Sequence, residues 1–207
     1  MLEKQSIFPI QVFRAQFGNA EELRKAVVPE LLAKEKSDQQ PIKYTANGYT
    51  SYGRENILDN PLFEELNASW YVYFLLILNQ FIDQAVKLCH QETNLLGEDN
   101  IKLASSWFSI NRKYTYHEEH THLPDVWSGV YYIQSDQDHP GLTLVNPNMK
   151  SNWPRVGVKS LTDANSPVVT CQALTGSLII FPSHLSHKVD QQLVDKERIM
   201  VAFNYGF

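Results

Sequence analysis

Residues 167–205 read PVVTCQALTGSLIIFPSHLSHKVDQQLVDKERIMVAFNY. Short apolar and β-branched runs in this stretch are separated by turn-forming residues, a pattern typical of antiparallel strands. The pattern predicts strands at 167–173, 177–182, 186–190 and 197–205. The residues before it continue in the same way and predict strands at 104–111, 116–122, 127–134 and 141–145. Eight short strands in about a hundred residues predict a mainly β fold of the double-stranded β-helix type, a cupin-like jelly roll.

The region before these strands has mostly helical patterns. Asn19 is a good helix N-cap, and it predicts a helix towards Lys36 that is interrupted at Pro29. Asn60-Pro61 predicts the start of a second helical region, because asparagine suits the cap and proline the first helical position. Before both, Ile7–Phe13 reads as a short edge strand.

The strongest helix is predicted from Trp70 to about His90. Its apolar residues recur at spacings of three and four and form one stripe: Tyr71, Phe74, Leu75, Leu78, Phe81, Ile82, Ala85 and Cys89. Helices first and strands later favour helices packed on one side of a β-sandwich. We therefore expect one domain over 1–207, with a helical N-terminal support region at 1–100 and a double-stranded β-helix core at 101–207.

The composition indicates a folded globular chain. Its 207 residues are 43% hydrophobic and 20% charged, and the net charge of −5 argues against a nucleic-acid-binding surface. Met1–Ser6 lacks the features of a signal peptide, and the most apolar run, Trp70–Leu78, is shorter than the roughly 20 residues that cross a bilayer. Cys89 and Cys171 are expected to be reduced core thiols. We expect a soluble, cytoplasmic protein that binds neither nucleic acid nor membrane.

Three histidines and one arginine in the strand-rich region have a spacing with chemical meaning. His120 and His122 are two residues apart, so on a strand both side chains point to one face. The distant His187 can complete a facial metal site that leaves positions open for substrate and O2. Arg198 supplies a planar fork of donors for a carboxylate. The set predicts a non-haem iron oxygenase that uses 2-oxoglutarate.

The other histidines give weaker signals. The string that begins at His117 is superficially similar to a zinc-protease helix, but that motif needs histidines at i and i+4, and residue 121 is a threonine. The sequence therefore argues against a metalloprotease. His90 and His139 are predicted to be structural, and His184 is predicted to lie at the surface or beside the ligands.

The segments around the three predicted metal ligands and Arg198 resemble, in order and spacing, the putative 2OG-Fe(II) oxygenase family. This family is a branch of the 2-oxoglutarate dioxygenases with a prolyl-hydroxylase-like core. The resemblance is dense from about Trp107 onward and is carried by residues 120–122, 127–133, 176–182, 187 and 198–204, with a similar start at 7–9. It implies a double-stranded β-helix that binds Fe(II) and 2-oxoglutarate. It also implies the activity of an oxidoreductase: a dioxygenase that converts 2-oxoglutarate to succinate and CO2 and hydroxylates a C–H bond.

The resemblance assigns a role to each matching residue. His120 matches the first ligand of the His-x-Asp pair, and His187 matches the distal histidine. Arg198 matches the basic residue that binds the far carboxylate of 2-oxoglutarate. Tyr131 matches a tyrosine that reaches the same carboxylate in prolyl hydroxylases, and its neighbour Tyr132 should then point to the opposite face.

Two positions depart from the usual pattern. Met200 stands where many relatives have a small hydroxyl residue, which predicts a less polar 2-oxoglutarate pocket. His122 stands where the superfamily usually has Asp or Glu, and imidazole suits zinc, copper and nickel as well as iron. Glu118, two residues before His120, lies on the same predicted strand face and is an alternative carboxylate ligand.

The remaining candidates concern the rims of the pocket. Asn111 and Asn204 lie near the ends of predicted strands and are candidates for contact with 2-oxoglutarate or an iron-bound water. The segments 41–58 and 146–166 are candidate substrate-selecting loops, and the second is long and polar enough to act as a lid. The primary substrate is expected to be a peptide, with prolyl hydroxylation suggested only by the resemblance, or a small molecule.

Two other readings remain open at the level of sequence. One is a cupin-type metal enzyme with three histidine ligands that does not use 2-oxoglutarate, and Arg198 argues against it. The other is a catalytically silent β-sandwich that binds a partner and holds at most a structural metal.

Overall fold

The computed structural model describes residues 10–39, 41, 47–54, 56–59, 70–149, 159–163 and 165–207. Two antiparallel sheets face each other, one of six strands in the order β1-β8-β5-β10-β3-β2 and one of four in the order β4-β9-β6-β7. The strands are β1 (Phe13–Gln16), β2 (Tyr49–Thr50), β3 (Lys102–Asn111), β4 (His117–His120), β5 (Trp127–Gln134), β6 (Leu142–Val145), β7 (Val168–Cys171), β8 (Ser177–Pro182), β9 (His187–Val189) and β10 (Arg198–Gly206). This is the predicted jelly-roll architecture.

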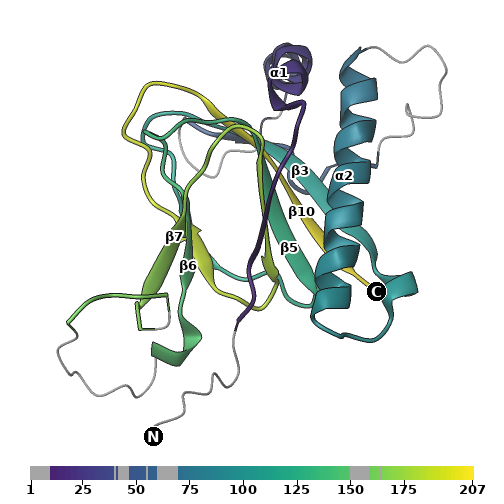
Figure 1. Ribbon diagram of the computed structural model, residues 1–207. Coiled ribbons are helices and arrows are strands. Elements are labelled where there is room, and N and C mark those ends of the chain that lie inside the picture. The colour runs from purple at the N-terminus through teal and green to yellow at the C-terminus, as the bar shows by residue number, and fades with distance from the viewer. Residues whose placement is uncertain are drawn as a thin grey trace, which may run out of the picture.

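The helices lie on the outer side of the six-stranded sheet, opposite the side that faces β6 and β7 (Figure 1). They are α1 (Ala20–Ser37) and α2 (Trp70–Glu92), and two short 3-10 turns, η2 (Glu98–Asn100) and η3 (Pro147–Met149), complete the described elements. The helices contact each other, and they reach the sheet at β5 and β8. The architecture is therefore helix layer, large sheet, small sheet.

Alternation along the central strands separates two apolar cores. One face of the large sheet packs against the helices, with Trp127, Ile133, Ile199, Val201 and Phe203 meeting Leu75, Leu78 and Ile82. The other face packs towards the small sheet, with Val130, Tyr132, Ile179, Phe181 and Met200 meeting Leu142, Leu144 and Val189. Because successive side chains point to opposite faces, each central strand contributes to both cores.

All eight predicted strands after residue 100 are present, with boundaries shifted by a few residues. The predicted strand at 7–13 is displaced: residues 10–12 are not in a strand, 7–9 lie outside the described residues, and β1 begins at Phe13 and pairs with β8. The helical region predicted from residue 60 lies outside the described residues, as do 150–158 within the long loop.

Helix α1 continues through Pro29, so the predicted interruption is wrong. Pro29 is exposed, and a carbonyl that loses its helical partner there can bond to water instead. The opposite face stays anchored because Leu23, Val27 and Leu31 are fully buried. Tertiary packing thus offsets the local cost of the proline.

Helix α2 is long and apolar enough to cross a membrane by length and composition. Its buried residues Val72, Leu75, Leu78, Ile82 and Val86 instead form a single stripe that belongs to the core of the domain. Its apolar character is therefore explained by its place over the large sheet. Cys89 and Cys171 are buried free thiols, as predicted.

The Arg112 guanidinium joins α1 to the sheet next to the candidate site. It donates to both oxygens of Glu35 at 2.7 Å and to Glu197 at 3.0 Å. Replacing Arg112 with alanine is expected to lower the free energy of unfolding by about 1–2 kcal/mol, since a bidentate, partly screened ion pair is lost and two carboxylates are left unpaired. Urea unfolding measures this change. Lys188→Ala, which removes an exposed pair with Asp190, is the control and should change stability by less than about 0.5 kcal/mol.

Candidate metal centre

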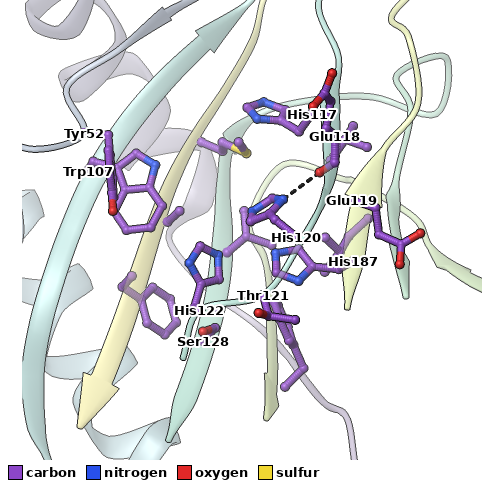
Figure 2. A pocket seen from close by; sticks show the side chains of 18 of the residues that line it. Tyr52, Trp107, His117, Glu118, Glu119, His120, Thr121, His122, Ser128 and His187 are labelled. Atoms are coloured by element: carbon purple, nitrogen blue, oxygen red, sulfur yellow. Dashed lines mark hydrogen bonds between the residues drawn. The ribbon is translucent and has the colours of Figure 1, made fainter. Parts of the chain in front are cut away.

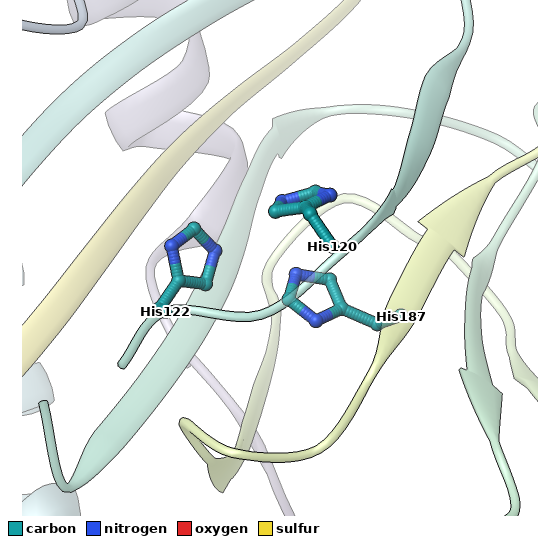
Figure 3. Close-up of side chains that lie close together, drawn as sticks. All are labelled: His120, His122 and His187. Carbon is teal, nitrogen blue, oxygen red and sulfur yellow. The ribbon is translucent and has the colours of Figure 1, made fainter. Parts of the chain in front are cut away.

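The three histidines predicted as ligands come together at the open edge of the small sheet (Figure 3). His120 ends β4, His187 begins β9, and these two residues pair across the two strands. His122 lies two residues beyond the end of β4. One ligand atom from each ring lies within 4.8 Å of those of the other two, and the ring centroids are 4.3–5.0 Å apart. Three imidazoles at this separation can share one metal ion.

Two of the rings are oriented by hydrogen bonds to the backbone. His120 Nδ1 lies 2.6 Å from the Glu118 carbonyl oxygen, and His187 Nδ1 lies 3.0 Å from the Leu185 carbonyl oxygen. In a neutral imidazole, donation from Nδ1 leaves the lone pair on Nε2, which is the usual way in which outer partners prepare a metal ligand. His120 and His187 are therefore preorganised to bind a metal through Nε2.

His122 is held differently. Within the described part of the chain, no hydrogen bond is made to its ring. Its backbone N–H donates to the Ser183 carbonyl oxygen at 2.9 Å, and its ring lies 5.8 Å from the Trp107 ring, centroid to centroid. The third histidine is thus positioned by its backbone and by packing, and its ring is the least constrained of the three.

Neither neighbouring carboxylate joins the histidines. The group able to hold a metal, among the residues that the structure describes, consists of the three histidines without Glu118. Glu118 is exposed, and Glu119 accepts a hydrogen bond from the Ser186 hydroxyl at 2.6 Å. The alternative in which Glu118 replaces His122 as a ligand therefore finds no support in the geometry.

Burial keeps two of the three histidines, His122 and His187, in the neutral form. It lowers the pKa of His187 to about 3 and that of His122 to about 4, and it also lowers the pKa of the nearby His117 to about 4. For His117 the nearby Arg198 guanidinium lowers the pKa further. Neutral imidazole is the form that binds metal, so the site is ready for a cation at neutral pH.

The lowered pKa values predict how the metal-free protein responds to acid. Between about pH 6.5 and pH 4 the unfolded chain binds protons at these histidines and the folded chain does not, so the free energy of unfolding falls as the pH is lowered. The melting temperature of metal-free protein should therefore decrease from pH 7.5 to pH 5. His122→Gln, which removes one of these groups, should make the decrease shallower, and a melting temperature that stays constant over this range would contradict the assignment.

A pocket of about 520 Å³ adjoins the histidines between the two sheets. Its inner wall is largely apolar and includes Val130, Leu142, Phe181, Val189 and Met200. Its outer part is aromatic, where Tyr52 and Trp107 meet edge to face at 4.8 Å. Figure 2 shows this pair on the side of the pocket opposite His117 and His120. The pocket thus has an apolar interior, a metal-binding wall and an aromatic mouth.

Arg198 lies behind the inner wall, at the start of β10. Its side chain is 1% exposed, Nη1 donates to the Pro140 carbonyl oxygen at 2.5 Å, and Nε has no hydrogen-bond partner. No carboxylate pairs with it among the described residues, and burial lowers its pKa from the ordinary value. Burying an unpaired cation is costly. The residue therefore fits an anionic ligand that supplies the missing partner.

The assignment of Tyr131 as a neighbour of Arg198 is wrong, and Tyr132 takes that place. Tyr131 packs on the helix side of the large sheet, with its ring centroid 6.1 Å from that of Phe17. Tyr132 lines the pocket and interacts electrostatically with Arg198. The reason is the strand register, in which Tyr132 pairs with Met200 and therefore shares the inner face with it.

Asn111 and Asn204 differ in whether their side-chain amides have a hydrogen-bonding group without a partner. Asn111 pairs with Arg198 across β3 and β10, and its Nδ2 is buried without a partner. Asn204 donates to the Ser105 hydroxyl at 3.0 Å and accepts from the Ser128 hydroxyl at 2.8 Å, so both ends of its amide are engaged. Asn111 therefore has a donor available for a ligand, whereas Asn204 belongs to a buried hydroxyl network.

The remaining histidines are structural or exposed. His90 accepts from Trp127 at 3.3 Å and its other nitrogen lies 3.1 Å from the Leu96 carbonyl oxygen. His139 bonds to the backbone at Asp136 and Lys196. His184 is exposed and does not line the pocket. The predicted structural roles of His90 and His139 are confirmed.

Sequence reasoning missed Tyr132, His117, Trp107 and Tyr52 as pocket residues. One signal was available for Tyr132. Along β5, the alternate set Ser128, Val130, Tyr132 and Gln134 is more polar than Trp127, Tyr131 and Ile133, and the more polar set faces the site. For the aromatic pair at the mouth there was no such signal, because Tyr52 comes from a distant loop.

Two facing sheets, three converging histidines and a buried arginine behind one pocket are the features that the sequence predicts for a metal-binding double-stranded β-helix protein. Residues 105–204, which contain all of these features except the helices and two edge strands, match the family described as Putative 2OG-Fe(II) oxygenase. The matched residues are just under half of the chain, and the family name states iron and 2-oxoglutarate, the two cofactors that the sequence predicts.

Solved structures confirm the predicted fold. The chain is 15% identical to a prolyl-4-hydroxylase from Pseudomonas putida, covering 95% of this chain and 92% of that one with a TM-score of 0.60. It is 13% identical to a Trichoplax adhaerens prolyl hydroxylase in complex with a hypoxia-inducible-factor peptide (94% and 83% covered, TM-score 0.62). It is also 13% identical to HygX from Streptomyces hygroscopicus with nickel and 2-oxoglutarate bound (95% and 83%, 0.57). No curated protein matches the sequence.

Proposed function

We propose that this protein is an Fe(II)- and 2-oxoglutarate-dependent hydroxylase. His120, His122 and His187 hold the metal, and Arg198 binds the far carboxylate of 2-oxoglutarate. One observation carries the proposal: three imidazoles converge on one point, and a buried guanidinium that has no carboxylate partner among the described residues lies behind the same pocket. The first feature suits a divalent cation and the second an organic anion.

The histidines and Arg198 have separate binding roles at the two ends of the pocket. The histidines leave part of the coordination sphere open, because only three protein ligands converge there. Arg198, with Tyr132 and Asn111 beside it, offers donors to a carboxylate. The apolar wall between them, with Val130, is suited to methylene groups and excludes water. When bound, iron and 2-oxoglutarate supply the oxidative decarboxylation that drives hydroxylation.

We assign the primary substrate to the aromatic mouth of the pocket. Tyr52 and Trp107 form a continuous aromatic wall that reaches His122, and Tyr52 belongs to the loop 41–58 predicted to select substrate. Such a wall suits the C–H face of a ring. Two proteins of similar fold have bound partners of two kinds: a prolyl hydroxylase is in complex with a peptide, and HygX has hygromycin B bound. We therefore propose a peptidyl substrate, prolyl included, or a small ring-bearing molecule.

Substrate-stimulated succinate formation tests this assignment. A prolyl peptide and an aminoglycoside are compared as stimulants of 2-oxoglutarate turnover, in the wild type and in Trp107→Leu. The stimulating compound should lose its effect in the variant while the unstimulated turnover stays the same. Equal loss of both rates would show that Trp107 supports the fold or the cofactor pocket, and not the substrate.

An anaerobic titration of Fe(II)-loaded protein with 2-oxoglutarate tests the function itself. A weak visible charge-transfer band, produced by a chelated 2-oxo acid, is expected, and it should disappear in His187→Ala. Bound iron without the band would favour a three-histidine cupin that does not use 2-oxoglutarate. Absence of iron binding would favour a silent binding module.

A further inference from the structure

Two buried hydrogen-bond donors on neighbouring residues lack partners behind the inner wall of the pocket. They are Arg198 Nε and Asn111 Nδ2, on side chains that are 1% and 3% exposed. Arg198 and Asn111 are direct neighbours across β10 and β3. Because a buried donor without an acceptor costs free energy, an adjacent pair of them indicates a ligand with two acceptor oxygens.

His117 determines which end of the Asn111 amide is free. His117 Nε2 lies 3.1 Å from Asn111 Oδ1, and a neutral ring that donates from Nε2 occupies the oxygen end. The amino end is then the one left without a partner. Burial lowers the pKa of His117 to about 4, so the ring stays neutral at working pH and brings no further positive charge beside Arg198. The ring also lines the pocket (Figure 2).

We propose that His117 is a positioning residue for 2-oxoglutarate: it holds the Asn111 amide so that Asn111 Nδ2 and Arg198 Nε are presented together to the far carboxylate. The inference rests on the proposed function, in which Arg198 binds that carboxylate. His117 is separated from the ligand His120 by a break in the strand register, and it is not one of the three converging histidines. Its nitrogen bonded to Asn111 is not available to a metal.

The experiment compares two oxo acids that differ at the far end. Anaerobic Fe(II)-loaded protein is titrated with 2-oxoglutarate and with 2-oxobutanoate, which has the same chelating end and no second carboxylate. His117→Ala should raise the Kd for 2-oxoglutarate about tenfold, the loss of about one hydrogen bond, and leave the Kd for 2-oxobutanoate unchanged. His117→Gln, whose amide can still donate to Asn111, should restore 2-oxoglutarate binding to within about threefold of the wild type.

Three further variants test whether His117 acts through Asn111 and whether the effect is specific to His117. The double variant of His117→Ala and Asn111→Ala should bind 2-oxoglutarate no more weakly than Asn111→Ala, because the two act as one unit. Iron affinity should be unchanged in all of them. His184→Ala, an exposed histidine outside the pocket lining, is the matched control and should have no effect.

Other outcomes distinguish a wrong role for His117 from a wrong assignment of the protein's function. If His117→Ala weakens both oxo acids equally, or neither, the positioning role is wrong. If Arg198→Ala weakens 2-oxoglutarate binding while His117→Ala does not, only this inference fails. If Arg198→Ala also leaves 2-oxoglutarate binding unchanged, the proposed function fails with it.

Discussion

Replacement of Arg198 with alanine is expected to raise the Kd for 2-oxoglutarate by about 100-fold and to leave Fe(II) affinity within about threefold of the wild type. A guanidinium that pairs with a carboxylate through charge-assisted hydrogen bonds contributes about 1.5–3 kcal/mol to binding, and each 1.4 kcal/mol is tenfold in Kd. The effect should be near the upper end of this range because Arg198 is fully buried and no carboxylate competes for it among the described residues. Anaerobic titration of the charge-transfer band measures the change.

Two controls accompany Arg198→Ala. Arg198→Lys keeps the charge and loses the planar fork, so it should recover only part of the affinity. Lys188→Ala removes a positive charge from β9, next to His187, and should leave 2-oxoglutarate binding unchanged because Lys188 is paired with Asp190. The alanine variant should stay folded, since the wild type carries the cost of burying an unpaired cation. Unchanged 2-oxoglutarate affinity in a folded Arg198→Ala protein would remove this residue from the cofactor site.

The second large effect concerns the metal. His187→Ala is expected to reduce Ni(II) or Co(II) affinity by at least about 100-fold, whereas His122→Ala should reduce it only about tenfold. His187 is 5% exposed and its Nδ1 is held by the Leu185 carbonyl, so a preorganised ligand is lost. His122 has no partner for its ring among the described residues, and ligands that lack such support contribute less to metal affinity.

Isothermal titration calorimetry measures the metal affinity of both variants. The metal-free proteins are titrated with Ni(II) or, under anaerobic conditions, with Co(II). His184→Ala serves as the control because it removes a histidine three residues from His187 without touching the pocket. Equal losses in His187→Ala and His122→Ala would show that the missing ring hydrogen bond does not weaken His122. A site that retains full affinity in His187→Ala would place the metal elsewhere.

The pattern of the chain predicted most of the fold. Strands at 127–134 and 177–182 were predicted with the observed bounds, and α2 followed from its apolar stripe. The set of His120, His122, His187 and Arg198 was also predicted from spacing and resemblance, and the structure brings the three histidines together. These predictions succeed because periodicity and residue chemistry are local properties of a sequence.

The features that were missed depend on contacts between distant segments. Tyr131 and Tyr132 are adjacent, and which of them faces the pocket depends on the pairing of Tyr132 with Met200, some 70 residues away. The role of His117 depends on its contact with Asn111 across two strands, and the aromatic mouth depends on Tyr52 reaching Trp107. Strand register and loop placement are set by the free energy of the whole packed core. Spacing along the chain therefore predicts which residues belong to the candidate site. The assembled sheets determine which face each of these residues occupies and which partner it contacts.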